Sequence, residues 1–176
     1  MLIVQQVSRT FGKQEAVKDL TFSLQEGEIF GLLGPNGAGK TTTIKMITGM
    51  LRLSSGQITL DGVDIEKDPV NVKQQIGYVP DRPVVFDRLT GREFIDFMGK
   101  LHQVRDAFSQ VIPYAKLFEM DDLIDRPIKG YSHGNKQKIV VLSQISFSPK
   151  LLILDEPTVG LDPKSAKTLR VVSTVA

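Results

Sequence analysis

The chain of 176 residues contains no cysteine, which excludes disulfides and cysteine metal sites and fits a reducing compartment. It has no large excess of either charge. The net charge of +2 is too small to indicate nucleic acid or an anionic membrane as a partner. No apolar run approaches the roughly 18 residues of a membrane span, and the apolar stretch before Gln5 is too short for a signal-peptide core. Any role at a membrane would therefore require a partner.

The composition, with 41% apolar and 24% charged residues, is that of a globular domain with a sizeable core. Leu20, Phe22 and Leu24 alternate as in a half-buried strand. The run EIFGLLG (28–34) predicts a buried strand leading into a glycine-rich loop. After the loop, the sequence predicts a helix with three apolar residues on one face: Ile44, Ile47 and Leu51.

Further along, Asp61-Gly62 between two alternating stretches predicts a hairpin, and 76–79 predicts a short strand. The pattern TGRE (90–93) is a capping box at a helix start. Prolines 113 and 127 are expected to interrupt the helices of this region. LLIL (151–154) is typical of a covered parallel strand, and Asp162-Pro163 opens a last helix. Together these elements predict an α/β fold.

GPNGAGKT (34–41) matches the phosphate-loop pattern G-x-x-x-x-G-K-[ST]. Glycines let backbone N–H groups close around phosphate oxygens, and the following helix points the positive end of its dipole at them. Lys40 would contact the β and γ phosphates, and the Thr41 hydroxyl would reach Mg²⁺. The residues predicted to contact the nucleotide here are Gly34, Pro35, Asn36, Gly37, Ala38, Gly39, Lys40, Thr41 and Thr42.

Two carboxylates follow the strand at 151–154, at the edge of an open α/β sheet where ligands collect. Asp155 would hold Mg²⁺, directly or through water, and Glu156 would polarise the water that attacks the γ-phosphate. On their own these residues are more typical of a strand that runs into a turn. Combined with the phosphate loop, they predict an ATPase in which Glu156 and Lys40 are catalytic.

The order of these motifs resembles that of the ATP-binding subunits of ABC transporters. TFG (10–12) resembles the family's adenine loop, in which Phe11 would stack on the base beside Val17. TVGLDP (158–163) resembles the D-loop, with Gly160, Leu161 and Asp162 in matching places. YSHGNKQK (131–138) lies where the signature motif belongs, and here the resemblance implies contacts of Ser132, His133, Gly134 and Asn135 with a nucleotide.

The resemblance implies a P-loop NTPase core with a mostly parallel sheet, a small antiparallel β part and a helical insertion. On this reading, 1–81 and 141–176 form the core, and about 82–140 form the helical subdomain. Two such domains, as a homodimer or heterodimer, would sandwich ATP, with the signature of one facing the phosphate loop of the other. ATP and Mg²⁺ are the implied cofactors, and a transmembrane permease the implied partner. Nucleic acid is not expected. The protein would lie in the cytoplasm, on the inner face of the cell membrane.

The sequence departs from the family pattern at three residues. Asp81 stands where the Q-loop glutamine is expected; it can approach Mg²⁺ or its water but donates no hydrogen bond. His133 replaces a signature glycine and Asn135 a glutamine. Such variants favour the branch of ABC-2-type exporters. The simpler interpretation of His133, as an exposed residue at a helix start that has no catalytic part, is favoured.

A histidine is expected roughly thirty residues beyond Glu156, but both histidines, His102 and His133, precede it. The chain therefore resembles a C-terminally truncated domain. Besides a transport motor, the motifs allow an ABC ATPase that regulates another process, and a switch that binds ATP with little hydrolysis. A GTP-binding protein is disfavoured, because NKQK (135–138) lacks the aspartate of the N-K-x-D guanine motif.

Overall fold

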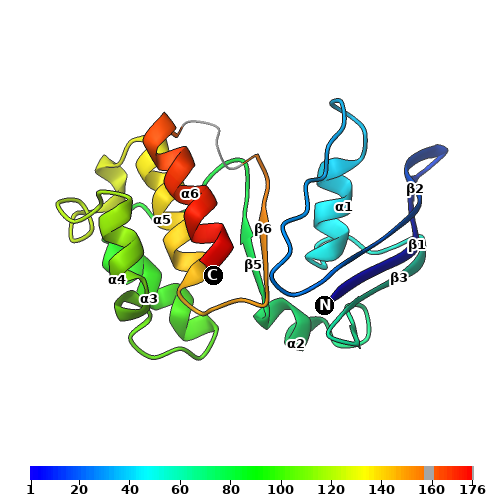
Figure 1. Ribbon diagram of the computed structural model, residues 1–176, viewed down its shortest axis with the longest axis horizontal. Coiled ribbons are helices and arrows are strands. Elements are labelled where there is room, and N and C mark those ends of the chain that lie inside the picture. Colours follow the sequence, from blue (N-terminus) through cyan, green and yellow to red (C-terminus); the bar gives the residue numbers. More distant parts are fainter. Residues whose placement is uncertain (157–160, 176) are drawn as a thin grey trace. The chain divides into compact units, whose positions relative to one another are not determined.

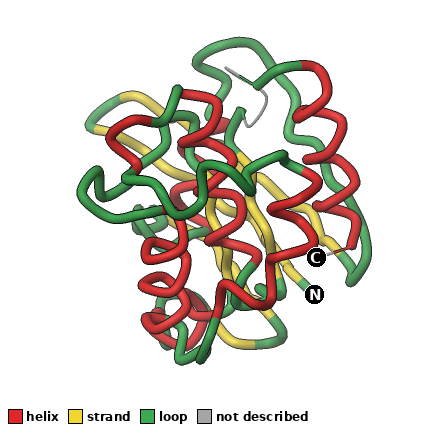
Figure 2. Tube along the Cα trace, turned by 90° about the vertical axis from the view of Figure 1, so that its left-hand side faces the viewer, coloured by secondary structure: helices red, strands yellow, loops and turns green. Residues whose placement is uncertain are grey.

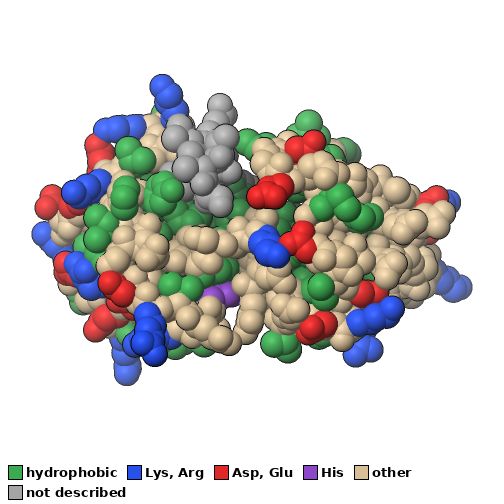
Figure 3. Space-filling model, turned by 60° about the horizontal axis from the view of Figure 1, so that its bottom comes forward, with side chains coloured by type: hydrophobic (Ala, Val, Ile, Leu, Met, Phe, Trp, Pro, Cys, Tyr) green, Lys and Arg blue, Asp and Glu red, His purple; other side chains and the backbone are tan. Residues whose placement is uncertain are grey.

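The computed structural model describes residues 1–156 and 161–175, with the side chains of the last helix described as far as Leu169. The chain divides into two compact units, Met1–Ile76 and Gly77–Ala176. Both contain strands and helices, so the predicted α/β class is confirmed (Figures 1 and 2). Basic and acidic side chains are interspersed on the face shown in Figure 3. No helix in 1–156 or 161–175 is long and apolar enough to cross a bilayer.

The first unit contains an antiparallel sheet with the strand order β2-β1-β3-β4. Its strands are β1 (Leu2–Phe11), β2 (Gln14–Leu24), β3 (Ser55–Leu60) and β4 (Val63–Asp64), and its helices are α1 (Lys40–Ile47) and α2 (Pro69–Gln74). The predicted hairpin is present: Leu60 pairs with Val63 across Asp61-Gly62, and both turn residues have positive φ. Leu51 lies beyond the end of α1, so only Ile44 and Ile47 of the predicted apolar face belong to the helix.

The expected strand at 28–34 is absent from the structure, and this prediction was wrong. The side chains of Ile29 and Leu33 are 72% and 92% exposed. Phe30 stacks on Phe22 of β2, with ring centroids 4.7 Å apart. An apolar run becomes a strand only where a neighbouring strand takes up its backbone hydrogen bonds. The segment is not part of the four-stranded sheet of this unit.

In the second unit, β5 (Ile76–Val79) and β6 (Leu151–Leu154) form a two-stranded sheet, and both strands run in the same direction (Figure 1). The helices are α3 (Gly91–Leu101), α4 (Ala107–Leu117), the 3₁₀ helix η1 (Ile128–Gly130), α5 (His133–Ile145) and α6 (Pro163–Val175). Their apolar faces, together with Val79, form one core that includes the fully buried Ile95, Phe118 and Leu142.

The capping box at the start of α3 is present, since Thr90 accepts a hydrogen bond from Glu93 N and Glu93 accepts one from Thr90 N. The expected interruption at Pro113 was wrong, because α4 continues through this residue. A proline inside a helix loses one backbone hydrogen bond. The buried face of α4, which includes Phe108 and Val111, offsets this loss by packing into the core.

Candidate functional site

The phosphate loop of the first unit has a backbone that requires glycine at position 39. Gly39 has φ +85°, and a Cβ added there would lie 2.5 Å from the carbonyl oxygen of Ala16 and 3.0 Å from Val17 Cγ2. A side chain at this position would therefore collide with the backbone of β2. The close approach fixes the loop against the antiparallel sheet, at the point where α1 begins.

Lys40, the first residue of α1, folds back over the loop. Its ammonium group donates hydrogen bonds to the carbonyl oxygens of Gly34 (2.6 Å) and Pro35 (2.9 Å). In the described residues no side chain caps the N-terminus of α1. Thr41 is exposed and Thr42 half-buried in this first turn. The exposed residues Pro35, Asn36, Gly37 and Ala38 form the outer part of the loop. A positive helix end and a primary ammonium thus lie on one exposed loop, which is the chemistry that binds phosphate.

The predicted adenine-binding residues belong to the same unit. Phe11 is the last residue of β1, and its side chain is 47% exposed. Val17 lies in β2 with 8% of its side chain exposed, packed towards Gly39. The guanidinium carbon of Arg9 lies 4.7 Å from the centre of the Phe11 ring. The resemblance to the adenine loop did not include Arg9, which lies two residues before Phe11 in the sequence.

In the second unit, the Asp155-Glu156 pair follows β6 directly. The Asp155 backbone N–H donates to Val79 O at 2.9 Å, which extends the pairing of β6 with β5. Asp155 is buried, whereas Glu156 is exposed with φ +48°, a conformation that L-residues seldom adopt. Strained backbone of this kind clusters at functional sites.

Tyr78 of β5 is a neighbour of Asp155 that the sequence reasoning missed. Its hydroxyl shares a hydrogen bond with the Asp155 carboxylate. Burial raises the pKa of Tyr78, and the nearby charges of Asp155 and Asp81 raise it further, so the phenol remains a proton donor. Asp81 itself is exposed, after the end of β5. Asp81 and Asp155, the two carboxylates predicted to contact Mg²⁺, thus both belong to the second unit and both act on the Tyr78 hydroxyl.

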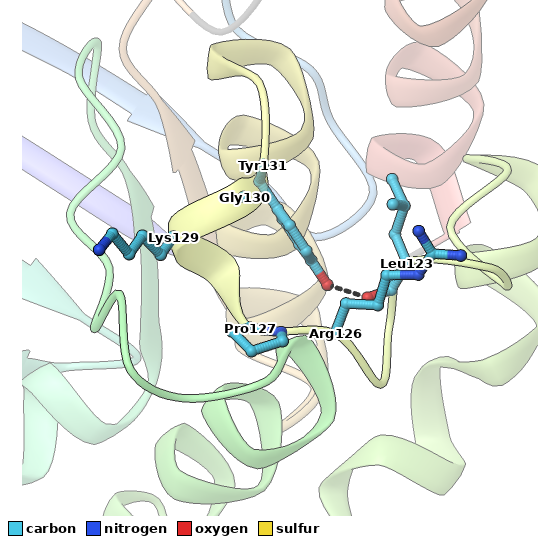
Figure 4. Close-up of a pocket in the computed structure, with 6 residues that line it drawn as sticks. All are labelled: Leu123, Arg126, Pro127, Lys129, Gly130 and Tyr131. Carbon is cyan, nitrogen blue, oxygen red and sulfur yellow. Dashed lines mark hydrogen bonds between the residues drawn. The ribbon is translucent and has the colours of Figure 1, made fainter.

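The signature stretch begins with a buried anchor. Tyr131 is 7% exposed, and its hydroxyl donates a hydrogen bond to Leu123 O (Figure 4). A Cβ at Gly91 would lie 2.7 Å from the Tyr131 oxygen, so α3 approaches this anchor closely. A cavity of about 570 Å³ lies beside it. The residues that line this cavity are Leu123, Arg126, Pro127, Lys129, Gly130 and Tyr131.

After the anchor, Ser132 is the N-cap of α5 and accepts a hydrogen bond from Asn135 N at 3.2 Å. His133 is exposed, while Gly134 and Asn135 are half-buried in the first turn. The exposure of His133 agrees with the simpler interpretation of this residue, a helix-start position open to solvent. The start of α5 therefore combines a hydroxyl and a helix N-terminus on the surface of the second unit.

The buried side of α5 holds two polar residues that follow the signature. Gln137 is fully buried and donates to Pro80 O at 3.1 Å. Lys138 is 8% exposed and donates to Phe118 O at 3.2 Å. Its ammonium group lies 3.7 Å from Asp162, which caps α6 by accepting a hydrogen bond from Ser165 N at 2.9 Å. Hydrogen bonds from the Ser165 hydroxyl and backbone lower the pKa of Asp162 to about 2.

The predicted site residues thus lie in two sets. Met1–Ile76 contains the loop 34–42 with Phe11 and Val17, and Gly77–Ala176 contains the carboxylates and the signature. Of the D-loop prediction, Leu161 and Asp162 are described, and Gly160 lies outside the described residues.

Comparison with known proteins identifies the family. The sequence profile described as "ABC transporter" matches residues 17–159. The linearmycin resistance ATP-binding protein LnrL of Bacillus subtilis is 41% identical over 94% of this chain and 54% of its own length. The daunorubicin resistance ATP-binding protein DrrA2 of Streptomyces coeruleorubidus is 34% identical over 90% of this chain and 50% of its own length. The chain thus spans about half the length of these two relatives.

A solved structure described as the ATP-binding subunit of an ABC transporter aligns with a TM-score of 0.92 and 30% identity. The alignment covers 99% of this chain and 73% of that one. The two-unit α/β architecture and the glycine loop define a P-loop nucleotide-binding domain. The chain belongs to the ABC transporter family, among its ATP-binding subunits.

Proposed function

We propose that the chain is the ATP-hydrolysing motor of an ABC exporter, in which ATP-driven dimerisation of two such domains powers a separate membrane subunit. The observation that carries the proposal is the phosphate loop, where Lys40 and the N-terminus of α1 lie on one exposed surface. Family membership and the two resistance proteins among the relatives support it. Resistance to a compound is what its export would provide.

Each set of residues has a part in this mechanism. The N–H groups of the loop and Lys40 would bind the β and γ phosphates, while Phe11 stacks on adenine. Glu156, exposed at the end of β6, would polarise the attacking water. Ser132 and the N-terminus of α5 would contact the γ-phosphate held by the partner domain, which stabilises the charge that develops there.

The donor set suits Mg²⁺, because hydroxyl and carboxylate oxygens are the ligands it prefers. In the first unit the Thr41 hydroxyl would contact the ion, and in the second unit Asp155 and Asp81, which follow β6 and β5, offer carboxylate oxygens for the same role. The described residues contain no cluster of three acidic or histidine side chains. When bound, Mg²⁺ supplies positive charge next to the transferring phosphoryl group.

The membrane partner is expected to dock on the second unit. Phe86 and Phe97 are exposed by 54% and 39% and pack edge to face, with centroids 5.3 Å apart. Val84 and Leu101, in the same stretch of chain, are also exposed. Exposed aromatic and aliphatic side chains of this kind anchor protein interfaces. The proposal therefore places the protein in the cytoplasm, held at the inner face of the membrane by a permease.

Two substitutions test the proposal in the full-length protein. Lys40→Ala is expected to abolish ATP binding, and Lys45→Ala, an exposed lysine in the last turn of the same helix, serves as its control. Glu156→Gln is expected to preserve binding and trap an ATP-bound dimer, measured by size-exclusion chromatography with light scattering. ATP binding without any gain of dimer in the Gln variant would exclude the sandwich mechanism. Failure to co-purify an integral membrane protein would exclude the transport part.

A further inference from the structure

Arg9 fixes one face of the predicted base-stacking residue. Its guanidinium carbon lies 4.7 Å from the centre of the Phe11 ring. One of its terminal nitrogens, Nη1, donates a hydrogen bond to the carbonyl oxygen of Arg52 at 3.1 Å. Arg9 Nε is buried and has no hydrogen-bond partner in the described part of the chain. The guanidinium is thus held between the Arg52 backbone and the ring.

The ring remains available on its other side. Phe11 is 47% exposed although Arg9 covers part of it. Phe11 ends β1 and pairs with Gln14 at the turn into β2. An aromatic side chain at a strand end would rotate about its χ angles unless a neighbour restrained it. The cation on one face provides that restraint, since ammonium-type and guanidinium groups bind the negative faces of aromatic rings.

The Phe11 ring and the phosphate loop belong to the same unit and are connected through β2. Arg9 pairs with Val17 across the β1–β2 ladder. Val17 Cγ2 would lie 3.0 Å from a Cβ at Gly39, so β2 packs directly against the loop. The residue that contacts the Phe11 ring therefore lies on the same pair of strands, β1 and β2, against which the phosphate loop packs.

We propose that Arg9 is a positioning residue for nucleotide binding: it holds the Phe11 ring in the orientation on which the base stacks. The inference rests on the proposed function and adds to it a residue that does not touch the nucleotide. A guanidinium is flat and charged at every physiological pH, so it can lie on the ring in a way that a lysine ammonium cannot. Loss of the contact should affect the base and leave the phosphates unaffected.

The test compares two ligands of the full-length protein, ATP and inorganic tripolyphosphate, by isothermal titration calorimetry. Arg9→Met is expected to weaken ATP binding by about two- to fivefold, the range of an exposed cation–π contact. Tripolyphosphate, which has no base, should bind Arg9→Met and wild type equally. In the Phe11→Ala background, Arg9→Met should cause no further loss. The matched control is Arg52→Met, which removes a neighbouring exposed arginine but keeps the backbone carbonyl that Arg9 contacts.

Three results would overturn the inference: unchanged ATP binding in Arg9→Met, equal weakening of both ligands, or an undiminished effect of Arg9→Met without Phe11. Equal weakening would mean that Arg9 acts on the phosphates. If Arg9→Met does not fold, Arg9→Lys keeps the charge, lacks the flat guanidinium and should show the same selective loss. Wild type that binds neither ligand would refute the proposed function itself. Wild type that binds both, with Arg9 variants indistinguishable from it, would refute only the role of Arg9.

Discussion

The ammonium group of Lys138 lies 3.7 Å from the carboxylate of Asp162 and connects α5 with the start of α6. The lysine is largely buried, whereas the aspartate is half exposed. Lys138 also donates to Phe118 O, so its charge has one acidic and one neutral partner in the described residues. Asp162, in turn, is the N-cap of α6. The signature helix and the segment before α6 are therefore held together by one buried cation.

Asp162 should make folding stability depend on pH in the acid range. Its pKa is lowered to about 2 in the folded protein, below the value of about 3.9 expected in the unfolded chain. A lowered folded-state pKa contributes stability that is complete above the unfolded pKa and is lost as pH falls through about 2. Asp162→Asn should reduce the loss of stability between these pH values, measured by urea unfolding. Glu26→Gln, at an exposed turn, is the control. An equal change in the acid dependence of stability in this variant would contradict the assignment of that dependence to Asp162.

Ser132 and Thr90 are both N-caps but are expected to differ in function. Replacement of either by alanine should destabilise the fold by about 1 kcal/mol, because a cap hydrogen bond is lost. Only Ser132→Ala should also weaken the ATP-bound dimer of the Glu156→Gln protein. The measurements are urea unfolding and light scattering with ATP. A dimer weakened equally by Thr90→Ala would show that helix stability alone explains the effect.

Alanine substitutions at Gly39 and Gly37 distinguish the effect of steric overlap from the effect of backbone strain. Both have positive φ, +85° and +84°, but a Cβ would meet Ala16 O at 2.5 Å only at Gly39, and nothing within 4 Å at Gly37. Gly37→Ala should cost about 1–2 kcal/mol for the left-handed conformation alone. Gly39→Ala should cost more, since the loop must move away from β2. Equal unfolding midpoints in urea for the two variants would refute the close approach of the loop to the sheet.

Tyr78→Phe removes the hydroxyl that is hydrogen-bonded to the buried Asp155. The variant should lose about 1 kcal/mol of stability, because the carboxylate loses a donor. Tyr114→Phe is the matched control, since Tyr114 is a half-buried tyrosine of α4 that is not among the predicted site residues. Thermal unfolding of both variants distinguishes them, and equal midpoints would contradict a role for the Tyr78 hydroxyl.

Local signals in the sequence predicted local structure well. The capping box at Thr90 and the Asp61-Gly62 turn both depend on residues within a few positions of each other, and both are present. The phosphate loop likewise begins a helix as its pattern predicts. The roles of the site residues in nucleotide chemistry remain predictions.

Features that depend on distant partners were missed or wrong. β1 was not predicted, since its apolar residues become a strand only by pairing, as Leu2 does with Leu24 and Leu60. The segment 28–34 was expected to be a strand from its apolar run alone, and it pairs with no strand of the sheet in its unit. The contact of Tyr78 with Asp155 joins two strands far apart in the chain, and no spacing rule reveals it.

The exposed segment 28–34 has a consequence for the colloidal behaviour of the protein. Ile29 and Leu33 present apolar surface, and surfaces of this kind promote self-association. The isoelectric point of about 8.8 and net charge of +2 leave little mutual repulsion near neutral pH. Concentrated solutions are therefore expected to precipitate most readily at mildly alkaline pH, near the isoelectric point. Replacement of Leu33 by a single charged residue should keep the protein soluble.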